Sequence, residues 1–324
     1  MRGGAIRRGG GRLRLGIGDD AAILAPLRGL ELIVTCDAFL EGVHFLGAVH
    51  PAESVGYKAL VRATSDIAAM GAIPRWFLLT LALPAERARA WLDRFLRGMA
   101  RAARAMGLCL AGGDTTRNPK VAISITLMGE IEAGCSLTRA GAAPGDLIYV
   151  SGRLGRADLG LELIRRGLGV KPGRGDWAKP LVRHHLYPQA RLGLGAWLAR
   201  HRIPSAMMDL SDGLSTDLAR LCEASKCGAM IWPEKIPQAR VPTRLMPHIR
   251  RLKLDLQKLA LHGGDDYELL FTVPPEKRKA LQGAPGFKDI ALIAEMTRQR
   301  RILAIDAKGI GIPLEPRGWD PFRG

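Results

Sequence analysis

The chain has 324 residues, of which 47% are hydrophobic and 24% are charged, a composition that is ordinary for a globular protein long enough for two domains. Its formal net charge of +17 favours acidic partners such as nucleic acid, anionic membranes or phosphorylated small molecules, but no aromatic run alternates with the basic residues as in single-strand binders. Five cysteines without a C-x-x-C pair argue against a disulfide framework or a structural zinc site.

No apolar run approaches the ~20 residues that cross a bilayer, and the first residues lack the apolar stretch of a signal peptide. We therefore expect a cytoplasmic protein with no membrane partner and no specific nucleic-acid partner. The first fourteen residues, MRGGAIRRGGGRLR, form the densest basic segment and are interpreted as a solvated tail of open function.

Strands that alternate with helices predict an α/β or α+β domain over residues 1–135. The elements expected there are strands over 31–39, 76–84 and 121–131, and helices over 54–74 and 86–107.

A segment rich in Gly and Pro, residues 138–155, predicts the transition to a second domain over 136–324. The elements expected there are strands over 146–152, 206–210 and 268–273, and helices over 158–167, 189–201 and 214–225. Residues 169–188 are expected to form a loop, whose role stays open.

Carboxylates recur beside glycine at the ends of apolar runs. They lie in the segments GIGDDAAIL, VTCDAF, AGGDTTR, MDLSDG and HGGDDYELLF. Asp66 differs, because it lies among apolar residues of an expected helix, where it could pair with Arg62 one turn earlier. Each acid also has a structural interpretation, since Asp beside Gly is common in turns and the MDLSDG residues could cap the helix near Gly213.

Taken together, these acids point to a site of hard oxygen ligands, because an apolar setting disfavours an unpaired charge and no His or Cys cluster accompanies them. Such ligands suit Mg²⁺ and a polyphosphate, and hence phosphoryl transfer. The chain has no P-loop and no protein-kinase signature, and GIGDDA lacks the third glycine of a dinucleotide fingerprint.

Seven segments, in this order, resemble the thiamine-monophosphate kinases. They are GIGDDAAIL, DAFLEGVHF, SDIAAMGA, AGGDTTR, TRAGAAPGD, DLSDGLSTDL and GGDDYELLF, with a weaker match at GWDPF. The parent superfamily includes aminoimidazole ribonucleotide synthetase, selenophosphate synthetase and a hydrogenase-maturation protein. The resemblance implies transfer of the ATP γ-phosphoryl group to thiamine monophosphate, directly and with Mg²⁺. It also implies a homodimer, in which the N-terminal domain would bind ATP and Mg²⁺ and contribute strands to a shared β-barrel beside a C-terminal α/β domain.

The same resemblance implies roles for individual residues. The metal ligands would be Asp20, Thr35, Asp37, Asp66, Asp114, Asp209 and Asp212. The ATP contacts would be Gly113, Asp114, Arg139 and Ser211, and the acceptor contacts His44, Asp265 and Trp319. Asp212 and Arg139 would carry the catalytic role, with the number of Mg²⁺ ions open. An acceptor phosphate oxygen is already ionised at neutral pH, so no general base is expected.

The chain departs from the family pattern at Cys36, Ala38, Ala63 and Asp265, where the family usually has a hydroxyl residue, a second hydroxyl residue, Asn and Glu. These differences keep open one alternative, a related enzyme acting on another phosphorylated acceptor. The net charge of +17 keeps open a second, a non-catalytic nucleotide- or RNA-binding protein. A selenophosphate synthetase is disfavoured, because its reactive Cys would lie in an N-terminal glycine-rich loop and the first Cys here is Cys36.

Overall fold

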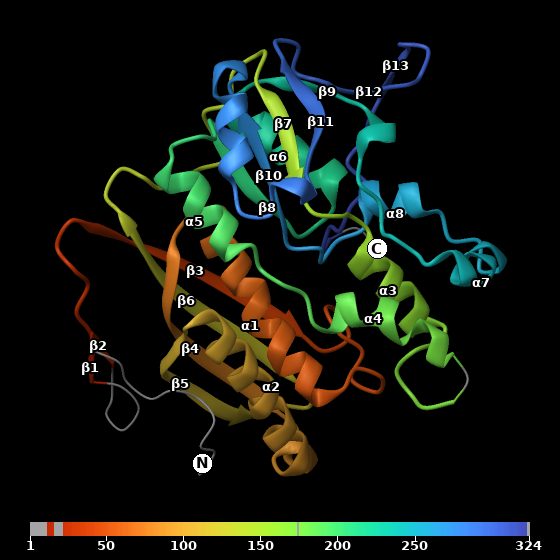
Figure 1. Cartoon of the computed structure of the whole chain (residues 1–324). Helices are drawn as coiled ribbons and strands as arrows, with labels where there is room; N and C mark the ends of the chain where they lie inside the picture. The colour runs from red at the N-terminus through yellow and green to blue at the C-terminus, as the bar shows by residue number, and fades with distance from the viewer. Residues whose placement is uncertain (1–11, 16–21, 174, 323–324) are drawn as a thin grey trace. The chain divides into compact units, whose positions relative to one another are not determined.

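The computed structural model of the chain describes residues 12–15, 22–173 and 175–322. It divides into two compact units (Figure 1). The first unit comprises the residues up to Ile67 together with Ala72–Ser136, and the second comprises Ala68–Gly71 and the chain from Leu137 onward. Among the described residues, no helix is long and apolar enough to cross a membrane.

A four-stranded sheet forms the centre of the first unit. Its strands, in spatial order, are β3 (Leu30–Leu40), β6 (Ala122–Glu132), β4 (Ile73–Leu83) and β5 (Cys109–Arg117). Neighbours are antiparallel except β4 and β5, which are parallel. A separate pair is formed by β1 (Leu13–Leu15) and β2 (Ile23–Leu24).

Two helices, α1 (Ala52–Ala69) and α2 (Ala90–Met106), pack on one face of this sheet (Figure 1). They approach closely where Gly56 faces the Phe95 carbonyl, because a Cβ at Gly56 would lie 2.0 Å from that oxygen. The 3₁₀-helix Ala85–Arg87 precedes α2, which ends at Gly107 in the left-handed conformation, φ 70°.

The three strands and two helices expected in this unit are present, but β5 was not predicted. Its sequence, CLAGGDTTR, contains two glycines and four polar residues, and its second half is exposed, so it lacks the apolar alternation of a strand. Of the basic tail, residues 1–11 lie outside the described residues. Arg12 is ion-paired with Glu130 and Leu13 is buried, so the solvated-tail interpretation is wrong for these two residues.

A seven-stranded sheet forms the centre of the second unit. Its spatial order is β13 (Gly311–Pro313), β12 (Ile302–Ile305), β9 (Gly228–Ile231), β11 (Ile290–Thr297), β7 (Leu147–Ser151), β10 (Glu268–Val273) and β8 (Ala206–Leu210). All neighbours are antiparallel except β12 and β9.

In the part of the second unit that the structure describes, six α-helices accompany this sheet: α3 (Arg156–Arg165), α4 (Lys179–Leu186), α5 (Leu192–Arg200), α6 (Leu214–Ser225), α7 (Met246–Arg251) and α8 (Leu256–His262). Short 3₁₀-helices span Asp176–Ala178, Pro233–Lys235, Thr243–Leu245, Pro275–Gly283 and Phe287–Asp289.

Both faces of the seven-stranded sheet are covered by apolar cores. Ile148 and Val150 of β7 lie in a core that includes Leu218 of α6, whereas the intervening Tyr149 lies in another core with Leu198 of α5. Strands that are buried on both faces appear in the sequence as continuous apolar runs, which is why β7, β8 and β10 were predicted correctly.

Helices α3, α5 and α6 confirm the helical patterns of the second half. The loop expected over residues 169–188 is wrong in part, because α4 occupies Lys179–Leu186. Pro180 in its first turn suits a helix start, and buried Leu181, Val182 and Leu186 supply its apolar face.

Candidate active site

The first unit brings together three of the residues implied as metal ligands. Thr35 and Asp37 lie on β3, and the Thr35 hydroxyl donates to Oδ2 of Asp66 on α1 at 2.6 Å. Arg62, one turn before Asp66, donates from Nε to Oδ2 of Asp37 at 2.7 Å. Burial raises the pKa of Asp37 and the Arg62 guanidinium partly offsets this, while the nearby Asp66 carboxylate raises it further.

These donors fit a hard divalent cation, because they are carboxylates and a hydroxyl, and because the Asp37 carboxylate already has a cation beside it in Arg62. Within the ranges that the structure describes, no three His, Cys, Asp or Glu side chains form a group ready to hold a metal. Asp20, which is also implied as a metal ligand, lies outside the described residues.

Gly113 and Asp114 lie on β5, at the opposite edge of the sheet from β3. Three strand spacings separate these edges, roughly 14 Å along the sheet. Gly113 has φ 149°, and a Cβ there would lie 1.9 Å from the Leu79 carbonyl oxygen, so only glycine fits. Asp114 is exposed, and its Oδ1 accepts the Thr115 backbone N–H at 2.8 Å. The sheet therefore keeps Asp114 apart from Asp37 within the unit.

His44 lies in the turn that follows β3. Its Nδ1 accepts the Leu40 backbone N–H at 3.0 Å, and its ring stacks on Phe39 at a centroid distance of 5.8 Å. Because Nδ1 is an acceptor, a neutral His44 carries its proton on Nε2, which is then a donor. The imidazole is half-buried, so its orientation is set by the turn itself.

In the second unit, the turn between β8 and α6 carries Ser211 and Asp212. The expectation that an acid or serine of this segment caps the helix is wrong: Gly213 is the N-cap, with φ 106° and no side-chain cap bond. Instead, Asp217 from the first turn of α6 accepts the backbone N–H groups of Ser211 at 3.1 Å and Asp212 at 3.0 Å. Glycine is required at the N-cap, because a Cβ there would lie 2.5 Å from the His262 carbonyl oxygen.

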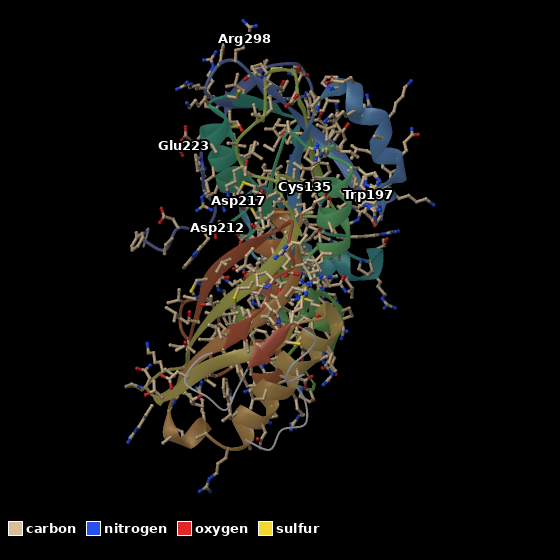
Figure 2. All side chains as sticks on the ribbon, turned by 90° about the vertical axis from the view of Figure 1, so that its left-hand side faces the viewer. Cys135, Trp197, Asp212, Asp217, Glu223 and Arg298 are labelled. Atoms are coloured by element: carbon tan, nitrogen blue, oxygen red, sulfur yellow. The ribbon has the colours of Figure 1, made fainter. Side chains whose placement is uncertain are left out.

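Arg220, one turn further along α6, donates from Nη1 to both Asp212 Oδ2 and Asp217 Oδ1. Figure 2 shows Asp212 and Asp217 side by side. The Asp217 side chain is fully buried, and burial together with the Asp212 charge raises the pKa of Asp217 to about 7. Asp212 thus repeats the relationship of Asp37 with Arg62: an acid implied as a metal ligand is neutralised by an arginine of the adjoining helix.

Asp209 and Arg139 are both placed by β8, the strand that precedes this turn. Asp209 is the buried penultimate residue of β8, opposite Leu269 of β10. Arg139 is exposed and is placed beside β8 because its neighbour Thr138 accepts the Met207 backbone N–H at 2.8 Å.

Asp265 precedes β10 and has φ 66°, an uncommon conformation for a residue with a side chain. Its backbone N–H donates to the Ser211 carbonyl at 2.8 Å. The hydroxyl of Tyr267, a fully buried residue, donates to Asp265 Oδ1 at 2.7 Å, and His185 Nδ1 lies 3.9 Å from Oδ2. Asp265, which stands where the family usually has Glu, is therefore held in place by the Tyr267 hydroxyl.

Trp319 is 40% exposed and lies next to the same turn. Its backbone N–H donates to the Asp212 carbonyl at 2.8 Å. The implied acceptor residues Asp265 and Trp319 are thus bonded to the two residues, Ser211 and Asp212, that are implied to bind ATP and metal.

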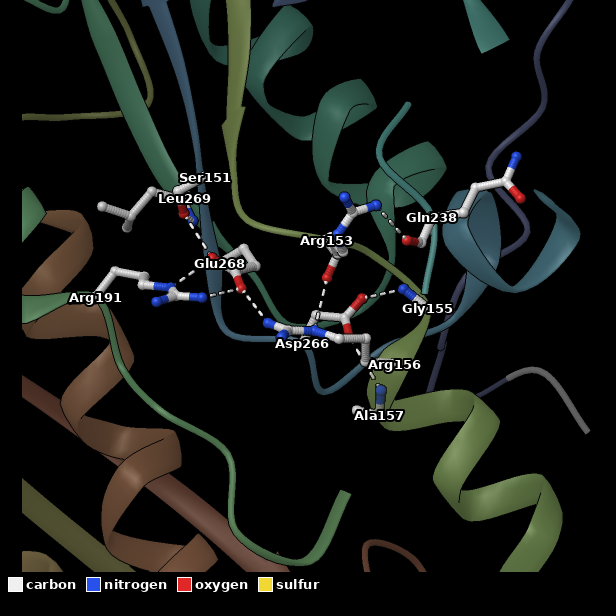
Figure 3. Close-up of polar contacts among 10 residues, drawn as sticks. All are labelled: Ser151, Arg153, Gly155, Arg156, Ala157, Arg191, Gln238, Asp266, Glu268 and Leu269. Carbon is white, nitrogen blue, oxygen red and sulfur yellow. Dashed lines mark hydrogen bonds and ion pairs between the residues drawn. The ribbon is translucent and has the colours of Figure 1, made fainter. Parts of the chain in front are cut away.

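Asp266 and Glu268, which follow Asp265 in the chain, belong to a network of hydrogen bonds and ion pairs (Figure 3). Glu268 is fully buried and accepts hydrogen bonds from Ser151 Oγ at 2.7 Å, Arg156 Nη2 at 2.7 Å, and Arg191 Nε and Nη2 at 2.5 Å each. Asp266 accepts the N–H groups of Gly155 at 2.5 Å and Ala157 at 3.1 Å, at the start of α3. Burial raises the pKa of Asp266 to about 7.

The sequence interpretation missed Arg62 as a partner of Asp37, and it missed Asp217, Arg220 and Glu268 altogether. Asp217 and Arg220 carried one available signal: an acid and a base three residues apart in the first turns of a helix that follows an acidic turn. Nothing in the sequence identified Glu268, because its arginine partners are 112 and 77 residues away in the chain.

Two family models match the chain over most of its length. The family model described as AIR synthase related protein, N-terminal domain, matches residues 18–131, and the one described as AIR synthase related protein, C-terminal domain, matches residues 143–306. Thiamine-monophosphate kinase from Escherichia coli (strain K12) is 37% identical over 312 residues, which cover 96% of this chain and 92% of that protein.

Solved structures are similar as well. The thiamine-monophosphate kinase from Stenotrophomonas maltophilia K279a has a TM-score of 0.79 at 35% identity, with 90% of this chain and 91% of that chain covered. A structure described as AaThiL complexed with AMPPCP and TMP has a TM-score of 0.78 at 33% identity, with 94% and 92% covered. These identities extend over nearly the whole length, so the chain belongs to the thiamine-monophosphate kinase family of the AIR synthase related proteins.

Proposed function

We propose that this kinase transfers the γ-phosphoryl group of ATP to thiamine monophosphate in one direct in-line step, giving thiamine diphosphate. The observation that carries the proposal is the Ser211–Asp212 turn, whose two consecutive carbonyls hold Asp265 and Trp319. Ser211 and Asp212, which would bind the nucleotide and its metal, are thereby hydrogen-bonded to Asp265 and Trp319, which would bind the acceptor. The relative whose structure contains AMPPCP and TMP supports the same pair of substrates.

The chain's own residues supply binding and charge. Arg139, which is exposed beside β8, would stabilise negative charge on the transferred phosphoryl group, and Ser211 in the turn after β8 would assist it. His44 would donate from Nε2 to the acceptor, since its Nδ1 is occupied by the Leu40 N–H. Asp265 would accept a hydrogen bond from the acceptor, and Trp319 would stack on its cationic ring. The acceptor phosphate is already ionised, so no side chain needs to remove a proton.

Mg²⁺ would be held in the first unit by Asp37 and Asp66 with Thr35, and also by Asp114 and by Asp20, which lies outside the described residues. In the second unit it would be held by Asp209 and Asp212. Bound there, it would neutralise phosphate charge during transfer. The donor set suits it, and the arginines Arg62 and Arg220 mark where positive charge is needed.

The first unit also supports a homodimer in which β3 joins a partner's sheet. β3 is an edge strand of eleven residues, and Leu32 and Val34 on it are 41% and 56% exposed. A long edge strand with exposed apolar side chains is a surface that proteins usually cover. A shared β-barrel and a cytoplasmic location both stay predictions, as do the boundaries 1–135 and 136–324 as functional domains.

The deciding experiment measures ADP release with Mg²⁺ and ATP, with thiamine monophosphate, free thiamine or an aminoimidazole ribonucleotide precursor as acceptor. We expect turnover with thiamine monophosphate only, and no label on the protein from [γ-³²P]ATP. Turnover with another acceptor and none with thiamine monophosphate would contradict the proposed acceptor. Label on the protein would contradict direct transfer.

Asp212→Asn tests the role of the turn in the same assay. We expect at least a ~100-fold loss of kcat with the melting temperature nearly unchanged, because the change removes a charge at the reacting phosphates rather than core packing. The control is Glu223→Asn, an exposed acid of α6, which should retain full activity. A normal kcat in Asp212→Asn would remove this residue from the mechanism.

A further inference from the structure

The turn from Ser211 to Asp217 also holds two residues from distant parts of the chain, Asp265 and Trp319. The peptide group between Ser211 and Asp212 is held at both ends: its carbonyl accepts the Asp265 N–H at 2.8 Å, and its N–H donates to Asp217 at 3.0 Å. The next carbonyl, that of Asp212, accepts the Trp319 N–H at 2.8 Å. One buried carboxylate therefore controls the place of two backbone groups that hold Asp265 and Trp319.

The segment that carries Trp319 is attached to this turn by side chains of α6 as well. The Gly318 N–H donates to Thr216 Oγ1 at 2.9 Å, and the Arg317 N–H donates to Ser215 Oγ at 3.2 Å. Successive N–H groups of the C-terminal segment thus meet successive hydroxyls of the first turn of α6. Ser215 is itself fixed, because its hydroxyl lies 2.9 Å from Nδ1 of His262.

The contact is close enough to require glycine at position 318. A Cβ there would lie 2.0 Å from the Asp212 carbonyl oxygen and 2.7 Å from Thr216 Oγ1. Backbone cannot give way as the end of a flexible side chain can, so the segment fits against the turn in one position. Trp319 follows directly and takes its position from that contact.

We propose that Asp217 and Thr216 are positioning residues of the kinase: Asp217 sets the turn that bears Ser211 and Asp212, and Thr216 fixes the C-terminal segment so that Trp319 meets the acceptor. This inference rests on the proposed function, in which Ser211 and Asp212 act on the nucleotide and Trp319 on the acceptor. In this proposal both residues act through the groups that they hold and not directly on a substrate. Their effects are separable, since the Thr216 hydroxyl bonds the segment that carries Trp319, whereas the Asp217 carboxylate holds the Ser211–Asp212 turn to which Asp265 and Trp319 are both bonded.

The first test replaces Thr216 by Val, which keeps the side-chain shape and removes the acceptor of the Gly318 N–H. We expect KM for thiamine monophosphate to rise about fivefold to tenfold, as for the loss of one hydrogen bond, with KM for ATP and kcat within about twofold of wild type. Thr216→Ser restores the hydroxyl and should restore KM. The matched control is Thr243→Val, at an exposed position in a separate 3₁₀-helix.

Two further variants separate the sides of the site. Gly318→Ala should raise KM for thiamine monophosphate and also lower kcat, because the added Cβ meets the Asp212 carbonyl. Asp217→Asn should lower kcat and raise both KM values, since Asn has one acceptor oxygen and cannot accept both the two N–H groups that meet Oδ2 and the Arg220 guanidinium that meets Oδ1. If Asp217→Asn fails to fold, the Thr216 series decides alone.

Hydrogen exchange on the ligand-free enzyme gives a readout that does not depend on activity. The amides of Gly318 and Trp319 should exchange slowly in wild type and faster in Thr216→Val, with Thr243→Val unchanged. Unchanged exchange, or a wild-type KM for thiamine monophosphate in Thr216→Val, would overturn the inference. A wild-type enzyme that does not turn over thiamine monophosphate would instead contradict the proposed function, and the exchange rates would still test the attachment.

Discussion

Arg62 donates from Nε to the Asp37 carboxylate at 2.7 Å, so an acid implied to bind metal is also the partner of an arginine one turn before Asp66 on α1. The pair joins a helix to the edge strand of the first unit, and both side chains are about one-fifth exposed. The second unit repeats the relationship with Arg220 and Asp212. In each unit a helix arginine therefore places a positive charge beside an acid that is implied to bind metal.

Replacing Arg62 by Ala should make the enzyme depend on Mg²⁺ for stability. Without metal, the half-buried Asp37 would face Asp66 with one compensating charge fewer, which should lower the free energy of unfolding by about 1–3 kcal/mol. Added Mg²⁺ should then stabilise the variant more than wild type. Thermal unfolding in EDTA and in Mg²⁺ measures both effects.

The control for this prediction is Arg165→Ala, because Arg165 pairs with Glu162 on the exposed surface of α3 and should contribute less than about 1 kcal/mol. An Arg62→Ala variant whose stability in EDTA matches this control would show that Arg62 does not compensate the acids.

Glu268→Gln should destabilise the second unit by about 3–5 kcal/mol, because it leaves the Arg156 and Arg191 guanidinium groups facing a neutral side chain in a buried place. Urea unfolding measures the change, with Glu223→Gln on the exposed face of α6 as the control. A double variant that also carries Arg191→Gln should recover part of the loss. Equal stability of Glu268→Gln and the control would contradict the role of the network.

Much of the fold was predictable because it follows from local pattern. β7, β8 and β10 are buried on both faces, and α2 has an apolar face, so the sequence carries their periodicity. β5 was not predictable, since its exposed second half is polar and its glycines serve the close approach to β4. Strand pairing of this kind is a long-range property that no short window contains.

Sequence motifs point to Asp37, Asp66 and Asp212 as candidate ligands, and that role stays a prediction. The arginines beside Asp37 and Asp212, and the Asp217 carboxylate that holds the turn, depend on tertiary contacts and could not be predicted from motifs. The helix-cap interpretation was wrong for a physical reason. Gly213 takes the N-cap with a positive φ that a larger residue disfavours, so the preceding amides turn to Asp217 instead.

Asp266→Asn should change how stability depends on pH. The pKa of Asp266 is about 7 in the folded chain, against an ordinary value near 3.9, so between about pH 4 and pH 7 the folded state binds a proton that the unfolded state does not. Wild type therefore loses stability as pH rises through this window. The variant lacks that loss, so its melting temperature relative to wild type should rise from pH 5 to pH 8 by roughly 2–4 °C for each kcal/mol removed.

The trend with pH is the quantity to compare, because Asn offers one acceptor oxygen where Asp266 offers two to the Gly155 and Ala157 amides. The raised pKa of Asp217 acts in the same window but is common to both proteins and cancels in the difference. A difference in melting temperature that stays constant from pH 5 to pH 8 would contradict the raised pKa of Asp266.

Val34→Lys should convert the proposed homodimer to monomers. Val34 is 56% exposed on the edge strand β3, and a lysine there places a charge where a partner sheet would need an apolar side chain. Light scattering after size exclusion measures the mass, with Ile312→Lys as the matched control, since Ile312 is 58% exposed on β13, an edge strand of the other sheet. We expect only Val34→Lys to dissociate the dimer. A monomeric wild type would contradict the homodimer, and a dimer that Ile312→Lys disrupts and Val34→Lys leaves intact would place the partner elsewhere than on β3.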